Sequence, residues 1–235
     1  MNYLEAILLG FVQGITEFFP ISSSGHLLIG RKLLDISNYS IIIEVALHIG
    51  TLFSILIYWR KEYLQDLNDF FSGNRKTLYN IIIGIIPAAI VGFVFKDYIK
   101  IYFYNIQDIS YLIITYFIMS CLLYISKYYY KNEKNNISYL NSFLIGLAQS
   151  FAIIPGFSRS GFTIIIGLLL GLNFKIVTKF SFMLAIPIIL FAGFETIMSN
   201  GVLIYKDFQL SIFLLLGIIT STISGYFILF YLERI

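Results

Sequence analysis

The sequence of 235 residues is poor in charge and has a single cysteine. Charged side chains make up 12% of the chain, whereas soluble domains carry about 25%. With Cys121 alone, the chain can form neither an internal disulfide framework nor a metal site built on several cysteines. The formal net charge of +3, without a dense basic cluster, also excludes a nucleic-acid-binding surface.

Hydrophobic residues are abundant instead. They make up 58% of the chain, and 23 phenylalanines and 18 tyrosines are more than one water-soluble core would bury. This composition predicts an all-α polytopic membrane protein. A spanning helix needs about 20 mostly apolar residues. Five stretches qualify: 41–59, 78–95, 109–126, 177–198 and 208–231.

Two further apolar stretches, 4–34 and 139–173, are interrupted in the middle. The interruptions, at 19–25 and 155–161, combine proline, serine and glycine, which break helices or favour caps and turns. Each half is too short to cross a bilayer alone. We therefore predict two re-entrant helical hairpins whose tips lie inside the membrane, where irregular backbone must be buried in protein or line a wet cavity.

The two broken stretches resemble each other, which indicates an internal repeat. Both contain a Gly-x-x-Gln motif and a later Ser-Gly pair, and two glycines recur in the spans that follow. The matched positions are Gly10 and Gly146, Gln13 and Gln149, Ser24 and Ser160, Gly25 and Gly161, Gly84 and Gly217, and Gly92 and Gly225. Chance similarity is the alternative, and the shared polar and glycine positions weigh against it.

We interpret the chain as one membrane domain, 1–235, that contains two repeats, 1–126 and 139–235. An odd number of crossings in each repeat inverts the second relative to the first, and such repeats place a polar site near the bilayer midplane. One side then holds the charged loops 60–77, 127–138 and 174–176 and the C-terminus, with nine lysines and arginines. The other side holds five, which predicts that the first side is cytoplasmic. The five are Arg31, Lys32, Lys96, Lys100 and Lys206.

The first hairpin carries polar groups that suggest phosphate chemistry, because polar residues inside a membrane are costly. Gln13 and Glu17 are four residues apart on one helix face. The hydroxyls of Ser22, Ser23 and Ser24, with free N–H groups of the next half-helix, would form an anion cradle. His26 follows Ser23 by three residues and could activate it as a nucleophile.

The second hairpin offers Ser158, Arg159, Ser160 and Thr163 at the start of its own second half. An arginine there suits bidentate binding of a phosphate. Two anion cradles together fit a diphosphate, and Glu17 would hold a divalent cation or position a proton. The rest of a substrate bound within lipid should be apolar.

Simpler interpretations exist for these residues. Serines can merely cap a helix break, although capping does not explain three serines with a histidine and a glutamate. Arg159 could form a structural ion pair with Glu17. Glu44 and His48 share a helix face, and we expect them to bond each other or to support the site from behind. The four repeated glycines in the spans are expected to pack helices closely.

Residues 13–26, QGITEFFPISSSGH, resemble the first signature of the undecaprenyl-diphosphate phosphatase (bacitracin-resistance) family, and residues 155–163, PGFSRSGFT, resemble the second. Similarity continues through residues 44–51 and 86–88 and covers essentially the whole chain. The resemblance implies an inverted repeat with two re-entrant hairpins. It also implies a membrane phosphatase that converts undecaprenyl diphosphate to the monophosphate lipid carrier used for cell-wall glycans.

The resemblance further implies that Ser23 is the nucleophile, that His26 and Glu17 are its catalytic partners, and that Arg159 binds phosphate. A divalent cation, Mg²⁺ or Ca²⁺, a homodimer, and a site open toward the outer face of the plasma membrane are family features. The residues expected to contact substrate are Gln13, Ser22, Ser24, Ser158, Ser160 and Thr163.

The chain departs from the family in two places. Gln13 stands where some members have glutamate, so a role that needs two carboxylates is in doubt. We also expect the final family helix to be missing after 208–231. Two interpretations rival the phosphatase. An inverted repeat with a midplane site also suits a polyprenyl-phosphate flippase that uses the same site, and the short C-terminus suggests an inactive homologue. The intact signatures argue against the second.

Overall fold

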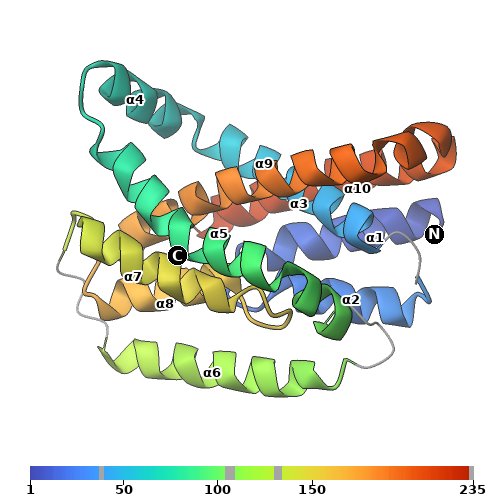
Figure 1. Cartoon of the computed structure of the whole chain (residues 1–235), viewed down its shortest axis with the longest axis horizontal. Coiled ribbons are helices and arrows are strands. Elements are labelled where there is room, and N and C mark those ends of the chain that lie inside the picture. The colour runs from blue at the N-terminus through green and yellow to red at the C-terminus, as the bar shows by residue number, and fades with distance from the viewer. Residues whose placement is uncertain (37–39, 104–108, 130–133, 233–235) are drawn as a thin grey trace. The chain divides into compact units, whose positions relative to one another are not determined.

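The computed structural model describes residues 1–36, 40–103, 109–129 and 134–232, which form ten helices (Figure 1). They are α1 (Tyr3–Thr16), α2 (Ser23–Leu33), α3 (Ser40–Tyr58), α4 (Arg60–Phe71), α5 (Lys76–Phe103), α6 (Tyr111–Tyr129), α7 (Tyr139–Phe151), α8 (Arg159–Leu169), α9 (Phe174–Lys206) and α10 (Phe208–Leu232). The predicted all-α class is confirmed over these ranges, where the only β-type pairing is an isolated bridge between Lys134 and Leu172.

Five of these helices are long and apolar enough to cross a membrane, which confirms the five predicted spans. They cover Ile41–Tyr58, Lys76–Phe95, Tyr111–Tyr128, Phe174–Lys206 and Phe208–Leu232. Helix α9 has 33 residues and extends beyond both ends of the predicted 177–198. The chain is therefore a multi-pass membrane protein.

Helix α4 occupies a region that the sequence analysis treated as a charged loop. Its apolar residues Leu64, Leu67 and Phe71 recur three or four residues apart, which is the spacing of one helix face. Lys179 of α9 donates to Asp66 of α4 at 2.9 Å, so an ion pair fixes the helix. The loop prediction was wrong here because it relied on charge and ignored periodicity.

Both predicted helix breaks are present. Helix α1 ends at Thr16 before α2 begins at Ser23, and α7 ends at Phe151 before α8 begins at Arg159. In the second break, Gly156 has φ +94° and a Cβ there would overlap the Thr115 side chain, so this turn requires glycine. Whether the two hairpins re-enter the membrane stays a prediction.

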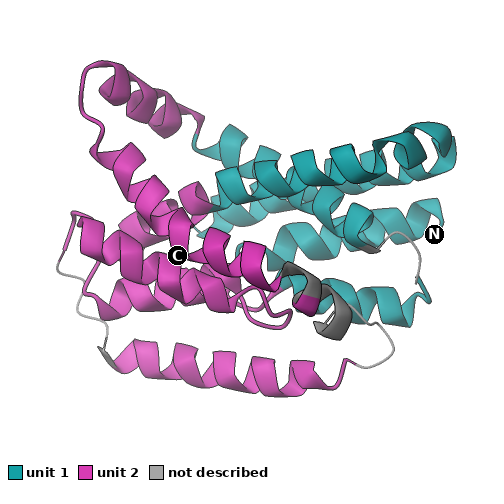
Figure 2. Cartoon of the chain, viewed as in Figure 1, with its two compact units in different colours: residues 1–18, 23–59, 185–235 teal, residues 19–22, 60–184 magenta. Residues whose placement is uncertain are grey.

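The chain divides into two compact units (Figure 2). Unit 1 comprises Met1–Phe18, Ser23–Trp59 and Ala185–Ile235, and unit 2 comprises Phe19–Ser22 and Arg60–Leu184. In unit 1, α10 packs along both α1 and α3; in unit 2, α5 packs along α7. Each unit therefore joins a broken helix pair to a long helix from the other half of the sequence. The limits of the two sequence repeats stay a prediction.

Glycines allow these helices to approach closely. A Cβ on Gly10 would lie 2.7 Å from the carbonyl oxygen of Gly217, and a Cβ on Gly146 would overlap the carbonyl of Gly84. These are matched positions of the predicted repeat, and they make the same kind of contact within each unit. Gly92 differs, because a Cβ there would have its nearest neighbour 3.8 Å away. The prediction of close packing was therefore wrong for Gly92.

One charge used to predict the orientation is buried. Arg31 lies in α2 with only 2% of its surface exposed, and its Nη2 donates to the carbonyl of Ile36 at 3.4 Å. A buried arginine does not report the membrane side, so the predicted orientation depends on how the remaining lysines and arginines divide between the two sides. Among these, Lys131 and Arg234 lie outside the described residues, as does the C-terminus, 233–235.

Candidate active site

In unit 1, Glu17 is the centre of a buried polar cluster. Its Oε2 accepts hydrogen bonds from Gln13 Nε2 at 3.1 Å and from Ser23 Oγ at 2.5 Å, and lies 3.4 Å from His48 Nε2. Gln13 reaches Glu17 because one helical turn separates them, as the sequence predicts, while Ser23 opens α2 across the break. The carboxylate is therefore in position to accept the proton of the Ser23 hydroxyl.

His48 is a member of this cluster that the sequence analysis did not assign to the site. Its Nδ1 lies 2.8 Å from the backbone carbonyl oxygen of Glu44. A carbonyl only accepts, so Nδ1 carries the hydrogen and Nε2 faces Glu17. Glu44 and His48, which we expected to bond each other, are thus linked through the backbone of Glu44. The other ring nitrogen of His48 contacts the Glu17 carboxylate. In the sequence, the spacing of Glu44 and His48 indicated that these two residues share a helix face. It did not indicate that His48 contacts Glu17.

The other predicted residues of the first hairpin surround Ser23 along the chain. Ser22 is buried, with φ +64°, and closes the turn before α2. Ser24 and His26 are half-buried residues of the first turn of α2. Ser23 donates its hydroxyl hydrogen to Glu17, so this bond favours Glu17 as the group that takes the proton. The catalytic role expected for His26 stays a prediction.

In unit 2, Ser158 and Ser160 form the start of α8. Ser158 is the N-cap, and its Oγ accepts from the backbone N–H of Gly161 at 3.0 Å. The capping interpretation is therefore confirmed for Ser158. The two hydroxyls lie 3.2 Å apart, and Ser160 Oγ also lies 3.5 Å from the carbonyl oxygen of Phe19, which belongs to the same unit. Residues from both breaks thus meet within unit 2.

Arg159 and Thr163 both contact Ser181, a residue of α9 that no sequence motif singled out. An Nη1 of Arg159 donates to the carbonyl oxygen of Ser181 at 3.2 Å, and Thr163 Oγ1 lies 2.6 Å from Ser181 Oγ. Ser181 and Thr163 are fully buried. The backbone carbonyl of Ser181 therefore accepts a hydrogen bond from the guanidinium, while the Ser181 hydroxyl pairs with Thr163.

Oxygen donors for a divalent cation are present in unit 1, although they are few. No group of three or more His, Cys, Asp or Glu side chains suited to a metal occurs among the described residues. Glu17 supplies one carboxylate, and Gln13 Oε1 is a fully buried oxygen with no hydrogen-bond partner beside it. Such a pair fits Mg²⁺ or Ca²⁺ only if substrate phosphates and water supply the remaining ligands.

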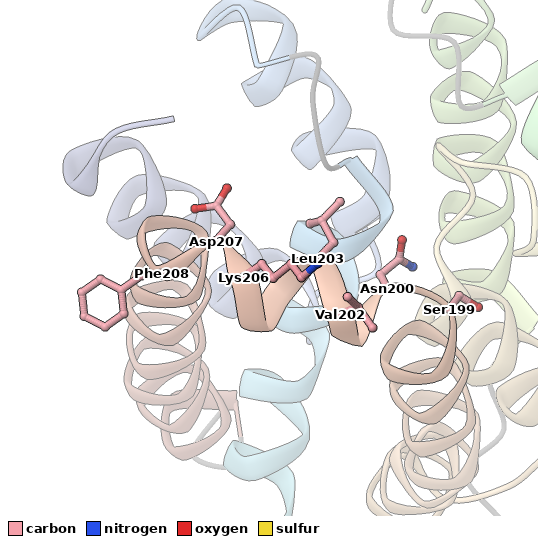
Figure 3. Close-up of a pocket in the computed structure, with 7 residues that line it drawn as sticks. All are labelled: Ser199, Asn200, Val202, Leu203, Lys206, Asp207 and Phe208. Carbon is pink, nitrogen blue, oxygen red and sulfur yellow. The ribbon is translucent and has the colours of Figure 1, made fainter.

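A pocket in unit 1 lies at the turn between α9 and α10 (Figure 3), away from the predicted residues along the chain. It is lined by Ser199, Asn200, Val202, Leu203, Lys206, Asp207 and Phe208. Asp207 Oδ1 accepts from the backbone N–H of Leu210, so the carboxylate caps α10. None of the predicted site residues lines this pocket.

Comparison with known proteins gives consistent matches over nearly the whole chain. Residues 6–235 match the family described as Bacitracin resistance protein BacA. The chain is 37% identical to an undecaprenyl-diphosphatase of Halothermothrix orenii, over 99% of this chain and 88% of the relative. It is 37% identical to undecaprenyl-diphosphatase 1 of Pseudoalteromonas translucida, over 96% and 87%. It is 41% identical to an undecaprenyl-diphosphatase of Bacteroides thetaiotaomicron, over 81% and 73%.

Proposed function

The chain belongs to the bacitracin resistance protein BacA family, and we propose that it is an undecaprenyl-diphosphatase of the membrane. It hydrolyses a polyprenyl diphosphate to the monophosphate and phosphate. The observation that carries this proposal is the buried hydrogen bond from Ser23 to Glu17, which couples a hydroxyl nucleophile to a base. The names of the relatives support the phosphatase; none mentions transport, so they give no support to the flippase.

In the proposed reaction, Ser23 Oγ attacks the terminal phosphorus while its proton passes to Glu17. A bond forms between Oγ and phosphorus, and the anhydride bond to the inner phosphate breaks, so polyprenyl monophosphate leaves. Water then hydrolyses the phosphoserine and releases phosphate. His26, three residues along α2 from Ser23, is proposed to activate this water.

Arg159 is proposed to bind the phosphate oxygens, because a guanidinium matches two of them at once. Its bond to Ser181 would orient the guanidinium before substrate arrives, which lowers the reorganisation that binding requires. Hydroxyls are proposed to supply further hydrogen bonds to the diphosphate. These come from Ser22, Ser24, Ser158, Ser160 and Thr163.

A divalent cation completes the proposal. Glu17 and Gln13 would hold it, and when bound it would neutralise charge on the phosphates. The loop charges support a plasma-membrane orientation with a cytoplasmic C-terminus, and the family resemblance supports a site open to the outer face. Cysteine-accessibility labelling in intact cells would test the orientation, and light scattering of the detergent-solubilised protein would test the homodimer.

The direct test is phosphate release from undecaprenyl diphosphate by the purified full-length chain, with and without Mg²⁺ or Ca²⁺. Parent protein should release one phosphate per lipid, and Ser23→Ala and Arg159→Ala should each lose most of the activity. Turnover by Ser23→Ala near the parent rate would contradict the nucleophile assignment. No phosphate release by the parent with either cation would contradict the proposed function itself.

A further inference from the structure

Gln149 has a buried carboxamide that has no hydrogen-bond partner among the residues that the structure describes. The residue lies in the last turn of α7, with only 2% of its surface exposed. Both Nε2 and Oε1 are enclosed and lack a hydrogen-bond partner. Leaving such groups unpaired in a protein interior is unfavourable, so a buried amide of this kind indicates a missing partner.

The rest of the second hairpin satisfies its polar groups. Every other buried polar side chain between residues 139 and 173 has a hydrogen bond to backbone or to a neighbouring hydroxyl. These side chains are Ser142, Ser150, Ser158, Ser160 and Thr163. Gln149 is therefore an exception within a hairpin that otherwise pairs its polar groups internally.

The matched residue of the predicted repeat shows what Gln149 lacks. Gln13 donates its amide to Glu17, four residues later. The residue four positions after Gln149 is Ile153, which offers no acceptor on its side chain. The carboxamide at this position is thus present in both hairpins, while the carboxylate that engages it is present in only one.

The position of Gln149 in the hairpin suggests which ligand it binds. Helices α7 and α8 pack together and are joined by residues 152–158, so the last turn of α7 and the first turn of α8 lie at the same end. The rings of Phe151 and Phe162, one from each of these turns, have centroids 5.8 Å apart. Gln149 therefore shares this end with Arg159, where an anion is favoured by the guanidinium and by the helix N-terminus.

We propose that the Gln149 carboxamide binds the diphosphate of the substrate, with its N–H₂ group donating to a phosphate oxygen. This inference rests on the proposed function, to which it adds a further binding residue. The ligand class is an oxyanion because the neighbouring groups at this end, a guanidinium and hydroxyls, all favour one. The unpaired amide is then retained for binding, at some cost to the stability of the ligand-free protein.

The test compares Gln149→Met with Ser150→Ala in the full-length chain in detergent. Methionine keeps the length of glutamine but cannot hydrogen-bond through N–H, and Ser150 is a buried neighbour whose hydroxyl is already satisfied by Gly146. We expect Gln149→Met to raise KM for undecaprenyl diphosphate about tenfold, as loss of a hydrogen bond to a charged group does. Its kcat should change little, its ligand-free Tm should not fall, and Ser150→Ala should match the parent.

An unchanged KM in Gln149→Met would overturn the proposal, whatever the Tm, because the amide would then contribute nothing to substrate binding. If Gln149→Met does not fold, Gln149→Glu decides: its carboxylate repels an oxyanion, so an unchanged KM again overturns the proposal. The Tm with and without inorganic pyrophosphate separates this inference from the proposed function. If the parent releases no phosphate, but pyrophosphate raises its Tm and Gln149→Met loses this rise, only the proposed function is contradicted. If the parent neither releases phosphate nor gains Tm with pyrophosphate, both are contradicted.

Discussion

The hydroxyl of Ser23 donates to Oε2 of Glu17 at 2.5 Å, and both side chains are at least nine-tenths buried. A short bond to a carboxylate is the geometry in which a serine proton is most easily transferred as Oγ attacks. The bond crosses the break between α1 and α2, so it depends on the turn that closes at Ser22 with φ +64°. The helix break therefore aligns the proposed nucleophile with its proposed base.

Glu17→Gln should abolish most of the phosphatase activity while leaving the fold intact. The amide keeps the size of the carboxyl group but cannot accept the Ser23 proton, so kcat should fall by about 10²–10⁴-fold, the usual contribution of a general base. Phosphate release at saturating substrate measures this effect. Glu62→Gln, an exposed substitution in α4, is the control and should retain full activity. A Glu17→Gln variant with near-parent kcat would exclude Glu17 as the base.

His48 should matter through its contact with Glu17, in which Nε2 donates when both ring nitrogens carry a hydrogen. His48→Leu removes that contact and should lower kcat by about 10- to 150-fold, because a buried bond to a charged group contributes about 1.5–3 kcal/mol. His48→Gln retains an N–H donor of similar reach and should recover most of the loss, with KM close to the parent value in both variants. Equal activity of His48→Leu and His48→Gln would show that the contact of 3.4 Å does not position Glu17.

Much of the fold could be predicted because its signals are local. A span is a run of apolar residues, and a break such as 155–161 is marked by proline, glycine and serine, so both were visible in the sequence. Helix α4 was missed because its apolar face is short and the segment contains many charged residues, which we took as the mark of a loop. Arg31 was counted among the charges that report the membrane side, although the structure buries it in α2.

The candidate site was predictable only where its members share a motif. Gln13, Glu17 and Ser23 lie within one signature, and helical spacing brings the first two together. His48 and Ser181 come from α3 and α9, and they reach their partners by tertiary packing that no local pattern encodes. Such residues are found from contacts alone, because one sequence carries no information on which distant helices will pack.

Tyr63 should make the protein lose stability in alkaline solution. Burial raises the pKa of its phenol above the usual range near 10, and the negative charges of Asp66 and Glu62 raise it further. The folded protein therefore holds this proton more tightly than the unfolded chain does. The associated stability is complete below about pH 10 and is lost as the pH rises through the folded-state pKa.

Thermal unfolding of parent and Tyr63→Phe between pH 8 and pH 11 measures this effect; the range is chosen around the phenol pKa of about 10. The phenol has no hydrogen-bond partner within the described ranges, so Tyr63→Phe should unfold at the parent temperature or slightly above it near neutral pH. Above about pH 10 its Tm should fall less steeply than that of the parent. Tyr79→Phe, at an exposed position of α5, is the control and should follow the parent curve. Parallel curves for parent and Tyr63→Phe would contradict the raised pKa.

Gly146→Ala and Gly92→Ala should have opposite effects on stability, although both replace a glycine inside an apolar helix. A Cβ at position 146 would overlap the backbone carbonyl of Gly84, which cannot move aside as a flexible side chain can, so α7 and α5 must separate. Overpacking of this kind costs about 1–3 kcal/mol, more than the gain of about 1 kcal/mol in helix propensity. At position 92 the nearest atom is 3.8 Å from the new Cβ, so the propensity gain should remain. Thermal unfolding in detergent should therefore give a lower Tm for Gly146→Ala and an equal or higher one for Gly92→Ala, and equal values would contradict the close approach of α5 and α7.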